Sequence, residues 1–518
     1  MAELERAEDR VAGPTDEVPS FMRVESTTLE PIVCTQSFAR FQLEPQGILS
    51  KDTCLQFRIN TSAAASDKMF LNVSTGISAL IRTCTLKIGG KVINQIQDVP
   101  FYHAMTKAYN SPSYRTGIDK HLHGIQTVVS QNTAVTTEAG TYTLRDVKPD
   151  SPTQASIPYS MLLKDAGGPY YAIWLRELCP ILNDIELPLF LLEKAGDITI
   201  ELVFNQQTST ATGASVGNIG GDVASNGLGT LAQPVATANV RADIDTSCTL
   251  DINSVKMFID RLYYESDRMA AVAERLNATQ GRMLNFVDVV STTASMPNSA
   301  FTGASAPPAG QIRVQTLTNQ IAVSGMRVQN LKWCYTVNDY TTQKAGGATS
   351  LTPRHSRDFT GRYAMLATQK DDAYNLRIND QLFYNTDVEN PAYKASELES
   401  IYAAPVALFT GLYSHNAMTN KEGAFTTKTH LFPATAAYSL AGGLELRQLE
   451  GAMHFAGANL SVAYGNASDD SVLIGQKPIE VIHRFPRSED DNFNYVARYY
   501  VETVKRFAMR DGLVEVFT

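Results

Sequence analysis

The strongest constraint on the fold of this chain is a short pattern that occurs twice, 290 positions apart. Residues 86–93 read LKIGGKVI and residues 376–383 read LRINDQLF, so that two strand-like runs flank a two-residue turn in both copies. Gly89-Gly90 suits a turn with positive φ, and Asn379-Asp380 are the non-glycine residues that best tolerate it. The pattern predicts the same tight hairpin in two places.

The surroundings of the two hairpins also match. An Asp-Val pair follows each one, Asp98-Val99 and Asp387-Val388, and leads into a short segment with aromatic residues that we expect to be helical. A single hairpin match can arise by chance, because such hairpins are common. The spacing, however, is near half of the 518 residues, and this length exceeds the roughly 250–300 residues that one core supports. We therefore expect a duplicated β-domain of about 240 residues.

Strand-like alternation of apolar and polar residues recurs in both halves, as expected where one face of a strand is buried. Residues 55–60 alternate strictly. Turn residues separate such runs at short intervals, which favours an all-β architecture with minor helices. The side chains expected on buried faces are Ile198, Ile200, Leu202 and Phe204 in the first half, and Leu331, Trp333, Tyr335 and Val337 in the second.

Two segments have helical character instead. Ser266-Asp267 can cap a helix, and Gly281 lies past its end, so residues 266–281 are expected to bridge the two domains. Asn390-Pro391 begins the other, with proline in the first turn, where its missing N–H costs nothing.

Two segments lack the apolar content of a core. Residues 1–20 are acidic and are expected to form a flexible arm, either disordered or ordered only against a neighbouring subunit. Residues 205–240 are rich in Gly, Ser, Thr, Ala and Asn, and are expected to form an exposed loop between two strands.

Composition excludes several classes of function. The net charge of −9 disfavours a nucleic-acid-coating role, since the surface as a whole repels phosphate. The chain has no apolar run of the roughly 20 residues that span a bilayer, and its first residues do not form a secretory signal, so we expect a soluble protein made in the cytosol. The six cysteines show no metal-binding spacing and are expected to be buried thiols.

No catalytic, cofactor or metal site is predicted. His121 and His123 would place two imidazoles on one side of a strand, but no third ligand is near in sequence, which favours an exposed polar strand. Residues 217–221 are glycine-rich but lack the Lys-Ser or Lys-Thr of a phosphate loop. The acidic pairs at 371–372 and 490–491 are expected to be solvated. Because glycosidase carboxylates can lie far apart in sequence, an enzyme stays an alternative.

Taken in order, these segments resemble the double jelly-roll major capsid proteins of double-stranded DNA viruses, especially those of virophages and polinton-like viruses. Residues 181–204 are similar to the Leu-Pro-Leu strand pair late in the first barrel of that family. Residues 255–276 are similar to its last strand and the turn into the second barrel, and LKIGGKVI to its glycine-rich hairpin. The chain departs from the family in the 205–240 insertion and in residues 493–518, which match loosely.

The resemblance implies two tandem eight-stranded antiparallel jelly rolls with short helices and long loops, at residues 21–265 and 282–518. It further implies a homotrimeric, hexon-forming subunit of an icosahedral capsid, made in the host cytoplasm and located in the virion. Its partners would be other copies, penton proteins and minor or cement proteins, with no specific nucleic-acid recognition. The alternatives are a tandem β-sandwich fibre or glycan-binding protein of a virion surface, and a polysaccharide-degrading enzyme.

Overall fold

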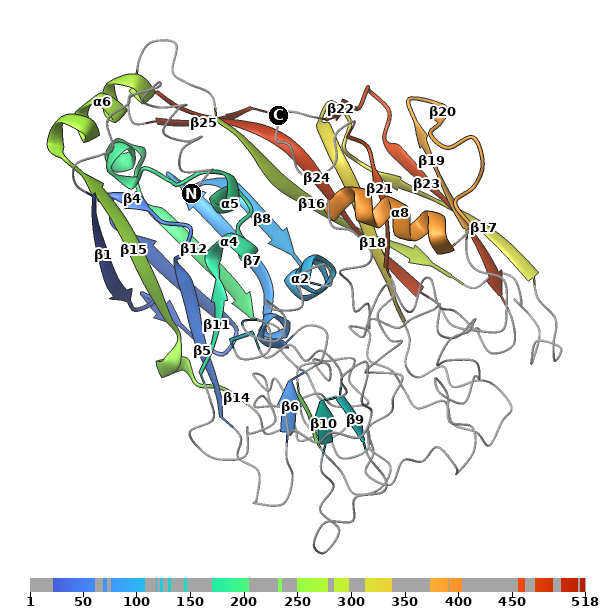
Figure 1. Cartoon of the computed structure of the whole chain (residues 1–518), viewed down its shortest axis with the longest axis horizontal. Helices are drawn as coiled ribbons and strands as arrows, with labels where there is room; N and C mark the ends of the chain where they lie inside the picture. Colours follow the sequence, from blue (N-terminus) through green and yellow to red (C-terminus); the bar gives the residue numbers. More distant parts are fainter. Residues whose placement is uncertain are drawn as a thin grey trace, which may run out of the picture.

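The computed structural model shows two pairs of β-sheets side by side (Figure 1). It describes residues 22–60, 69–71, 76–107, 118, 122–123, 129–131, 144–146, 170–204, 232–234, 249–277, 284–297, 313–337, 373–389, 391–402, 455–461, 471–487, 495–510 and 513–517. The predicted arm at 1–20, the glycine-rich 217–221, the acidic pairs and most of the predicted loop at 205–240 lie outside these residues.

The first pair of sheets, here called the first barrel, comes from the N-terminal half of the chain. One sheet has the order β1 (Met22–Leu29), β15 (Lys256–Tyr264), β5 (Cys54–Asn60) and β11 (Tyr170–Trp174), with β4 (Ile48–Leu49) and β14 (Thr249–Leu250) beside it. The other has the order β2 (Val33–Cys34), β3 (Phe38–Leu43), β12 (Ile198–Phe204), β7 (Ile81–Ile88) and β8 (Lys91–Gln97).

The second barrel comes from the C-terminal half. Its first sheet has the order β16 (Leu284–Met296), β24 (Tyr495–Arg510), β18 (Arg327–Val337) and β21 (Phe455–Asn459), with β22 (Val472–Leu473) and β25 (Leu513–Phe517) beside it. Its other sheet has the order β17 (Arg313–Ile321), β23 (Ile479–Arg487), β19 (Ala373–Ile378) and β20 (Gln381–Leu382).

The two barrels have the same topology. When the main strands of each barrel are numbered 1 to 8 along the described part of the chain, with the short additional strands left out, one sheet reads 1-8-3-6 and the other 2-7-4-5. All pairings within the sheets are antiparallel, and the last strand returns to lie between the first and the third. The identical order confirms the duplication that the repeated hairpin predicted.

The repeated hairpins occupy equivalent places, as strands 4 and 5 of each barrel. Gly89 and Gly90 have φ of 57° and 78°, and Asn379 and Asp380 have φ of 51° and 68°, as a type I′ turn requires. A short helix follows each hairpin, α2 (Val99–Lys107) in the first barrel and α8 (Pro391–Tyr402) in the second. This part of the sequence-based prediction is confirmed.

Each barrel is filled by the inward-facing residues of its two sheets. In the first barrel Phe57 and Phe204 meet edge to face across the sheets, with ring centroids 6.2 Å apart. Trp333 and Tyr374 meet in the same way in the second barrel, at 4.7 Å. The predicted inner face of β12 is confirmed, because Ile198, Ile200, Leu202 and Phe204 are all buried.

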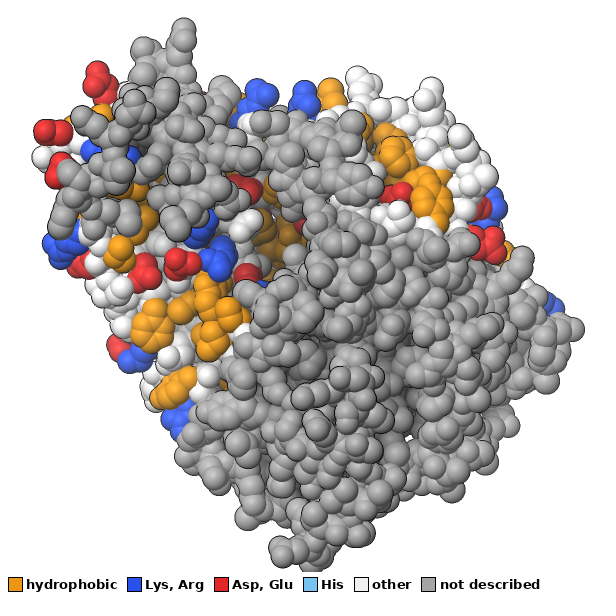
Figure 2. All heavy atoms as spheres, viewed as in Figure 1, with side chains coloured by type: hydrophobic (Ala, Val, Ile, Leu, Met, Phe, Trp, Pro, Cys, Tyr) orange, Lys and Arg blue, Asp and Glu red, His pale blue; other side chains and the backbone are white. Residues whose placement is uncertain are grey.

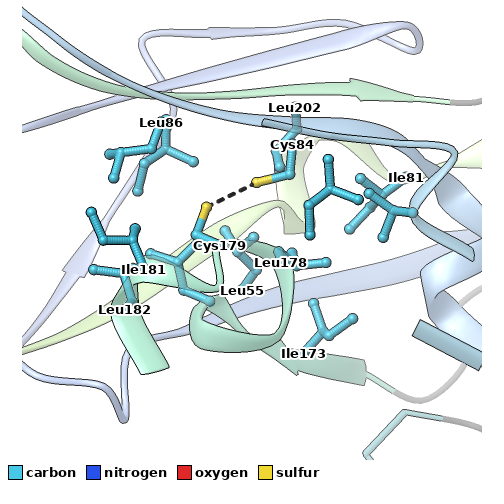
Figure 3. Close-up of a cluster of buried hydrophobic side chains, with 14 of the residues drawn as sticks. Leu55, Ile81, Cys84, Leu86, Ile173, Leu178, Cys179, Ile181, Leu182 and Leu202 are labelled. Carbon is cyan, nitrogen blue, oxygen red and sulfur yellow. Dashed lines mark hydrogen bonds between the residues drawn. The ribbon is translucent and has the colours of Figure 1, made fainter. Parts of the chain in front are cut away.

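The cysteines in the described residues are free thiols. Figure 3 shows Cys84 of β7 facing Cys179 in the core of the first barrel, with their sulfur atoms 3.4 Å apart. Cys334 is also buried, whereas Cys34 and Cys54 are partly buried. Burial raises the pKa of the Cys334 thiol to about 12. The prediction of buried thiols is therefore confirmed for Cys84, Cys179 and Cys334, which behave as small core residues, whereas Cys248 lies outside the described residues.

One predicted strand pair is wrong. Within residues 181–204, β12 alone is a full strand, because the preceding part forms α5 (Ile181–Asp184) and the 3-10 helix η4 (Leu189–Ala195). Pro188 lies between them and has no N–H to give to a strand ladder. The apolar residues Leu189, Leu191 and Leu192 are buried under the barrel end instead of forming a sheet.

The remaining elements are short, apart from the predicted bridge. α6 (Ser266–Asn277) follows the last strand of the first barrel, where a bridging helix was predicted. Among the described residues, none of the helices is long and apolar enough to cross a membrane. The other short elements are η1 (Gly76–Leu80), α4 (Leu175–Leu178), η5 (Ile252–Ser254) and the strand pairs β6 (Met69–Leu71) with β13 (Ala232–Pro234) and β9 (Val129–Gln131) with β10 (Leu144–Asp146).

Candidate functional site at the seam between the barrels

Strand β18 is buried on both of its faces. Leu331 and Trp333 point into the core of the second barrel, as predicted, but Lys332 and Asn330 are each only 2% exposed as well. The second face is covered because α2 and β8 of the first barrel lie against this sheet (Figure 1). The contact between the barrels, called the seam below, is therefore lined by buried polar residues that must find partners there.

Glu502 of β24 is the centre of one polar group in the seam. Its Oε1 accepts hydrogen bonds from the Tyr102 hydroxyl, at 3.0 Å, and from Lys332 Nζ. Its Oε2 accepts one from Asn330 Nδ2, at 2.6 Å. Burial alone would raise the pKa of Glu502, but Lys332 and these hydrogen bonds hold it below its usual value. The carboxylate is thus charged and fully paired.

Asp98 and Asp288 make two more links across the seam. Asp98 ends the segment before α2, and its carboxylate pairs with Arg498 of β24. Its carbonyl oxygen accepts a hydrogen bond of 2.8 Å from the Tyr500 hydroxyl. Asp288 of β16 accepts a hydrogen bond from Asn94 of β8 and pairs with Lys505.

Apolar side chains connect the same elements. Phe286, Phe507 and Met509 of the second barrel belong to one continuous buried cluster with the core of the first barrel. Strand β25 extends this contact, because Val514 is buried in that cluster and its carbonyl oxygen accepts a hydrogen bond of 3.3 Å from Lys91 Nζ. Apolar burial and paired charges thus hold the two barrels at one relative position.

A second polar cluster lies on the other side of α2, within the first barrel. Glu177 of α4 contacts His103 and Lys107 of α2, and also His123. Desolvation would raise the pKa of Glu177, but His123, His103 and Lys107 together hold it far below its usual value. Burial lowers the pKa of His103 although Glu177 opposes this shift.

The predicted setting of His123 is wrong. His123 lies in a turn and not in a strand, and its side chain is fully buried and not exposed. His121, its expected partner, lies outside the described residues. The side chains that do meet His123 come from α2 and α4, which are distant in sequence.

Comparisons with known proteins give matches by structure alone. No family model matches the sequence, and no curated protein matches it. The structure of VP54 of PBCV-1, fitted into a reconstruction of the virophage Sputnik, superposes with a TM-score of 0.51 at 10% identity, over 97% of this chain and 98% of that chain. The Faustovirus major capsid protein superposes with a TM-score of 0.50 at 9% identity, over 98% and 94%. A chain of the Sputnik virophage superposes with a TM-score of 0.52 at 9% identity, over 98% and 91%.

The fold is the double jelly roll. The strand order in each barrel and the near-complete overlap with these capsid structures agree on it. The resemblance to the double jelly-roll capsid proteins is confirmed for the fold.

The buried polar residues of the double jelly roll were not singled out from the sequence. A signal was present, because Lys332 lies between the apolar residues Leu331 and Trp333, and Glu502 directly follows the apolar run Tyr499-Tyr500-Val501. A charge within such a run is usually placed on the solvated face of a strand. In this double jelly roll that face meets the other barrel, which a strand pattern by itself does not reveal.

Proposed function

We propose that this chain is the major capsid protein of an icosahedral double-stranded DNA virus, and that three copies form a pseudo-hexagonal capsomer. The observation that carries the proposal is that two barrels of identical strand order are held side by side by a buried seam. Three such chains present six similar units, which can tile the flat faces of an icosahedron. The similar solved structures, which are capsid proteins, support the same role.

Exposed apolar side chains support self-association. Figure 2 shows a group of them over the first barrel. On that barrel Tyr170 is 54% exposed, Val24 is 50% exposed and Phe258 is 38% exposed. Apolar groups gathered on a surface are typical of contacts between proteins. The proposed partners are other copies of the chain, penton proteins and minor or cement proteins, all in the virion.

We also propose the domain limits that the sequence predicts. Residues 1–20 would be an arm, 21–265 the first jelly roll, 266–281 the bridge and 282–518 the second jelly roll.

The proposed role is structural and uses no catalysis. The described structure offers no support for a glycan-reading surface on the tryptophans, since Trp333 is fully buried and Trp174 is partly buried.

The native mass of the purified full chain tests the proposal. A trimer has three times the 56.6 kDa of the chain, and negative-stain images should show a pseudo-hexagonal particle about 70–80 Å wide. A stable monomer under gentle conditions, or a particle without six similar lobes, would contradict the proposal. Co-expression with penton and cement candidates would then test assembly into shells.

A further inference from the structure

Three possible metal ligands meet inside the first barrel, and the capsid role does not explain them. They are His103 of α2, His123 of the turn at 122–123 and Glu177 of α4. The distance from His103 Nε2 to Glu177 Oε2 is 3.0 Å, and the distance from His123 Nε2 to the same oxygen is 3.4 Å. The two imidazoles are 1% and 0% exposed, and the Glu177 side chain is 13% exposed.

The 3.4 Å distance matches an edge of a tetrahedral site, and the 3.0 Å distance is slightly shorter than such an edge. Zinc binds nitrogen and oxygen ligands at about 2.0–2.2 Å, so two ligands of a tetrahedral ion are about 3.3–3.6 Å apart. Two imidazoles and one carboxylate are a ligand set that zinc uses, with the fourth position left to water. Calcium and magnesium are disfavoured here, because they take oxygen ligands in larger number.

The surroundings of the three side chains fix their orientation. Glu177 Oε1 contacts Lys107 Nζ, which leaves Oε2 facing the imidazoles. A ligating carboxylate is commonly hydrogen-bonded through its other oxygen in this way. The Trp174 ring packs edge to face on His123, at 5.6 Å, and the Ile77 amide donates a 2.7 Å hydrogen bond to the His123 carbonyl.

We propose that His103, His123 and Glu177 form a binding site for a divalent transition-metal ion of the zinc type. The ligand atoms would be Nε2 of each histidine and Oε2 of Glu177. The ion would tie α2 to α4 and to the turn at His123. Since Tyr102 and Asp98, at the start of α2, reach into the seam, the ion would also stabilise the position of the second barrel. This inference is independent of the proposed capsid role.

The competing explanation is that Glu177 is held by Lys107 and the two imidazoles without any metal. The two explanations differ in the effect of Lys107→Met. A metal site keeps its three ligands in this variant and should still bind zinc. Without a metal site, the variant would leave the buried carboxylate with the two imidazoles alone and would bind no zinc.

Metal content of the purified full chain is the first measurement. The chain is stripped with a chelator, reloaded with zinc and desalted, and the zinc per chain is measured. We expect about one ion per chain. The variants His103→Gln, His123→Gln and Glu177→Gln should not retain the ion. Loss of a residue that only supports a ligand lowers metal affinity by roughly 10–100-fold, and loss of a ligand itself should lower the zinc affinity at least as much.

A matched control and a second readout separate metal loss from misfolding. His483→Gln changes another buried imidazole, in the second barrel, and should keep the zinc. Cobalt added to the stripped chain should give the visible absorption of a tetrahedral ion, which the ligand variants should lack. Zinc should raise the melting temperature of the wild-type chain and of His483→Gln but not of the ligand variants.

The proposal is wrong if the wild-type chain binds neither ion and zinc leaves its melting temperature unchanged. Trimer formation is measured separately, so this failure and a failure of the capsid role are distinguishable.

Discussion

Gly89 and Gly90 occupy the same turn, but their surroundings differ. A Cβ on Gly89 would lie 2.1 Å from the carbonyl oxygen of Ala195, whereas a Cβ on Gly90 would have no atom within 4 Å. Both residues have positive φ, which costs a non-glycine residue roughly 1–2 kcal/mol. The first glycine is therefore required by space and by conformation, and the second by conformation alone.

We predict that Gly89→Ala destabilises the protein more than Gly90→Ala. The Gly90 variant should lose about 1–2 kcal/mol from backbone strain. The Gly89 variant should lose this amount and a further contribution, because η4 must move away from the turn. Chemical denaturation of both variants measures the difference. Equal losses would show that the contact with Ala195 is relieved at no cost.

Glu502 and Lys332 give a second prediction at this scale. Removing one member of a buried ion pair costs about 3–5 kcal/mol, because the other charge is left without compensation. Lys332→Met should therefore destabilise the protein by this amount. The double variant Lys332→Met with Glu502→Gln should lose less than the sum of the two single changes. A double-mutant cycle on the free energy of unfolding checks the coupling.

The pKa of Glu502 also predicts how stability depends on pH. Its folded pKa is below the usual value of 4.5. A lowered pKa contributes stability above the unfolded value, and this contribution disappears as the pH falls through the folded value. The free energy of unfolding of the wild-type chain should thus fall below about pH 4.5, and this fall should be smaller in Glu502→Gln. Unfolding free energies measured along a pH series, with Glu193→Gln as an exposed control on η4, test this.

At the scale of elements, α8 packs closely on β21 because Gly457 has no side chain. A Cβ there would lie 2.7 Å from Ile401 Cδ1 and 3.0 Å from Leu398 Cδ2, both on α8. The same strand accepts a hydrogen bond of 2.7 Å from the Tyr374 hydroxyl at the Gly457 carbonyl. The second barrel therefore uses this glycine to place a helix against its sheet.

We predict that Gly457→Val displaces α8 and destabilises the second barrel by about 1–3 kcal/mol, the usual cost of overpacking a core. Gly457→Ala should lose less, because a single methyl group requires smaller shifts of the helix side chains and of the Leu331 carbonyl oxygen, which would lie 3.1 Å from the added Cβ. Leu473→Ala, at a position that is 57% exposed, is the control and should have little effect. Hydrogen exchange of α8 locates the change.

Sequence patterns predicted these elements unevenly. The hairpins, β12 and α8 followed from turn residues and periodicity, which act within a few neighbouring positions. The strand expected around Pro188 and the exposed strand expected at His123 were wrong, since burial by distant elements decided both. The cluster of His103, His123 and Glu177 could not be predicted, because its members are 20 or more positions apart and nothing in their spacing marks them.

At the scale of the whole molecule, the seam makes the two barrels one cooperative unit. Asp98, Asp288 and Glu502 each link the barrels, and the apolar cluster of the first barrel extends to residues of β16, β24 and β25 in the second barrel. A pseudo-hexagonal capsomer of the proposed kind needs this rigidity. Its six lobes keep even spacing only if the two barrels of each chain cannot rotate against one another.

We predict that loosening the seam separates the barrels thermally and weakens assembly. The wild-type chain should unfold in one calorimetric transition, whereas Asp98→Ala combined with Asn94→Ala should show two, because each barrel keeps its own core. The same variant should form fewer regular hexagonal particles than the wild-type chain. Lys477→Ala removes an ion pair with both side chains 63% exposed and should change neither property. If the double variant still unfolds in a single transition, with particles like those of the wild-type chain, then apolar burial alone holds the barrels and the polar links are dispensable.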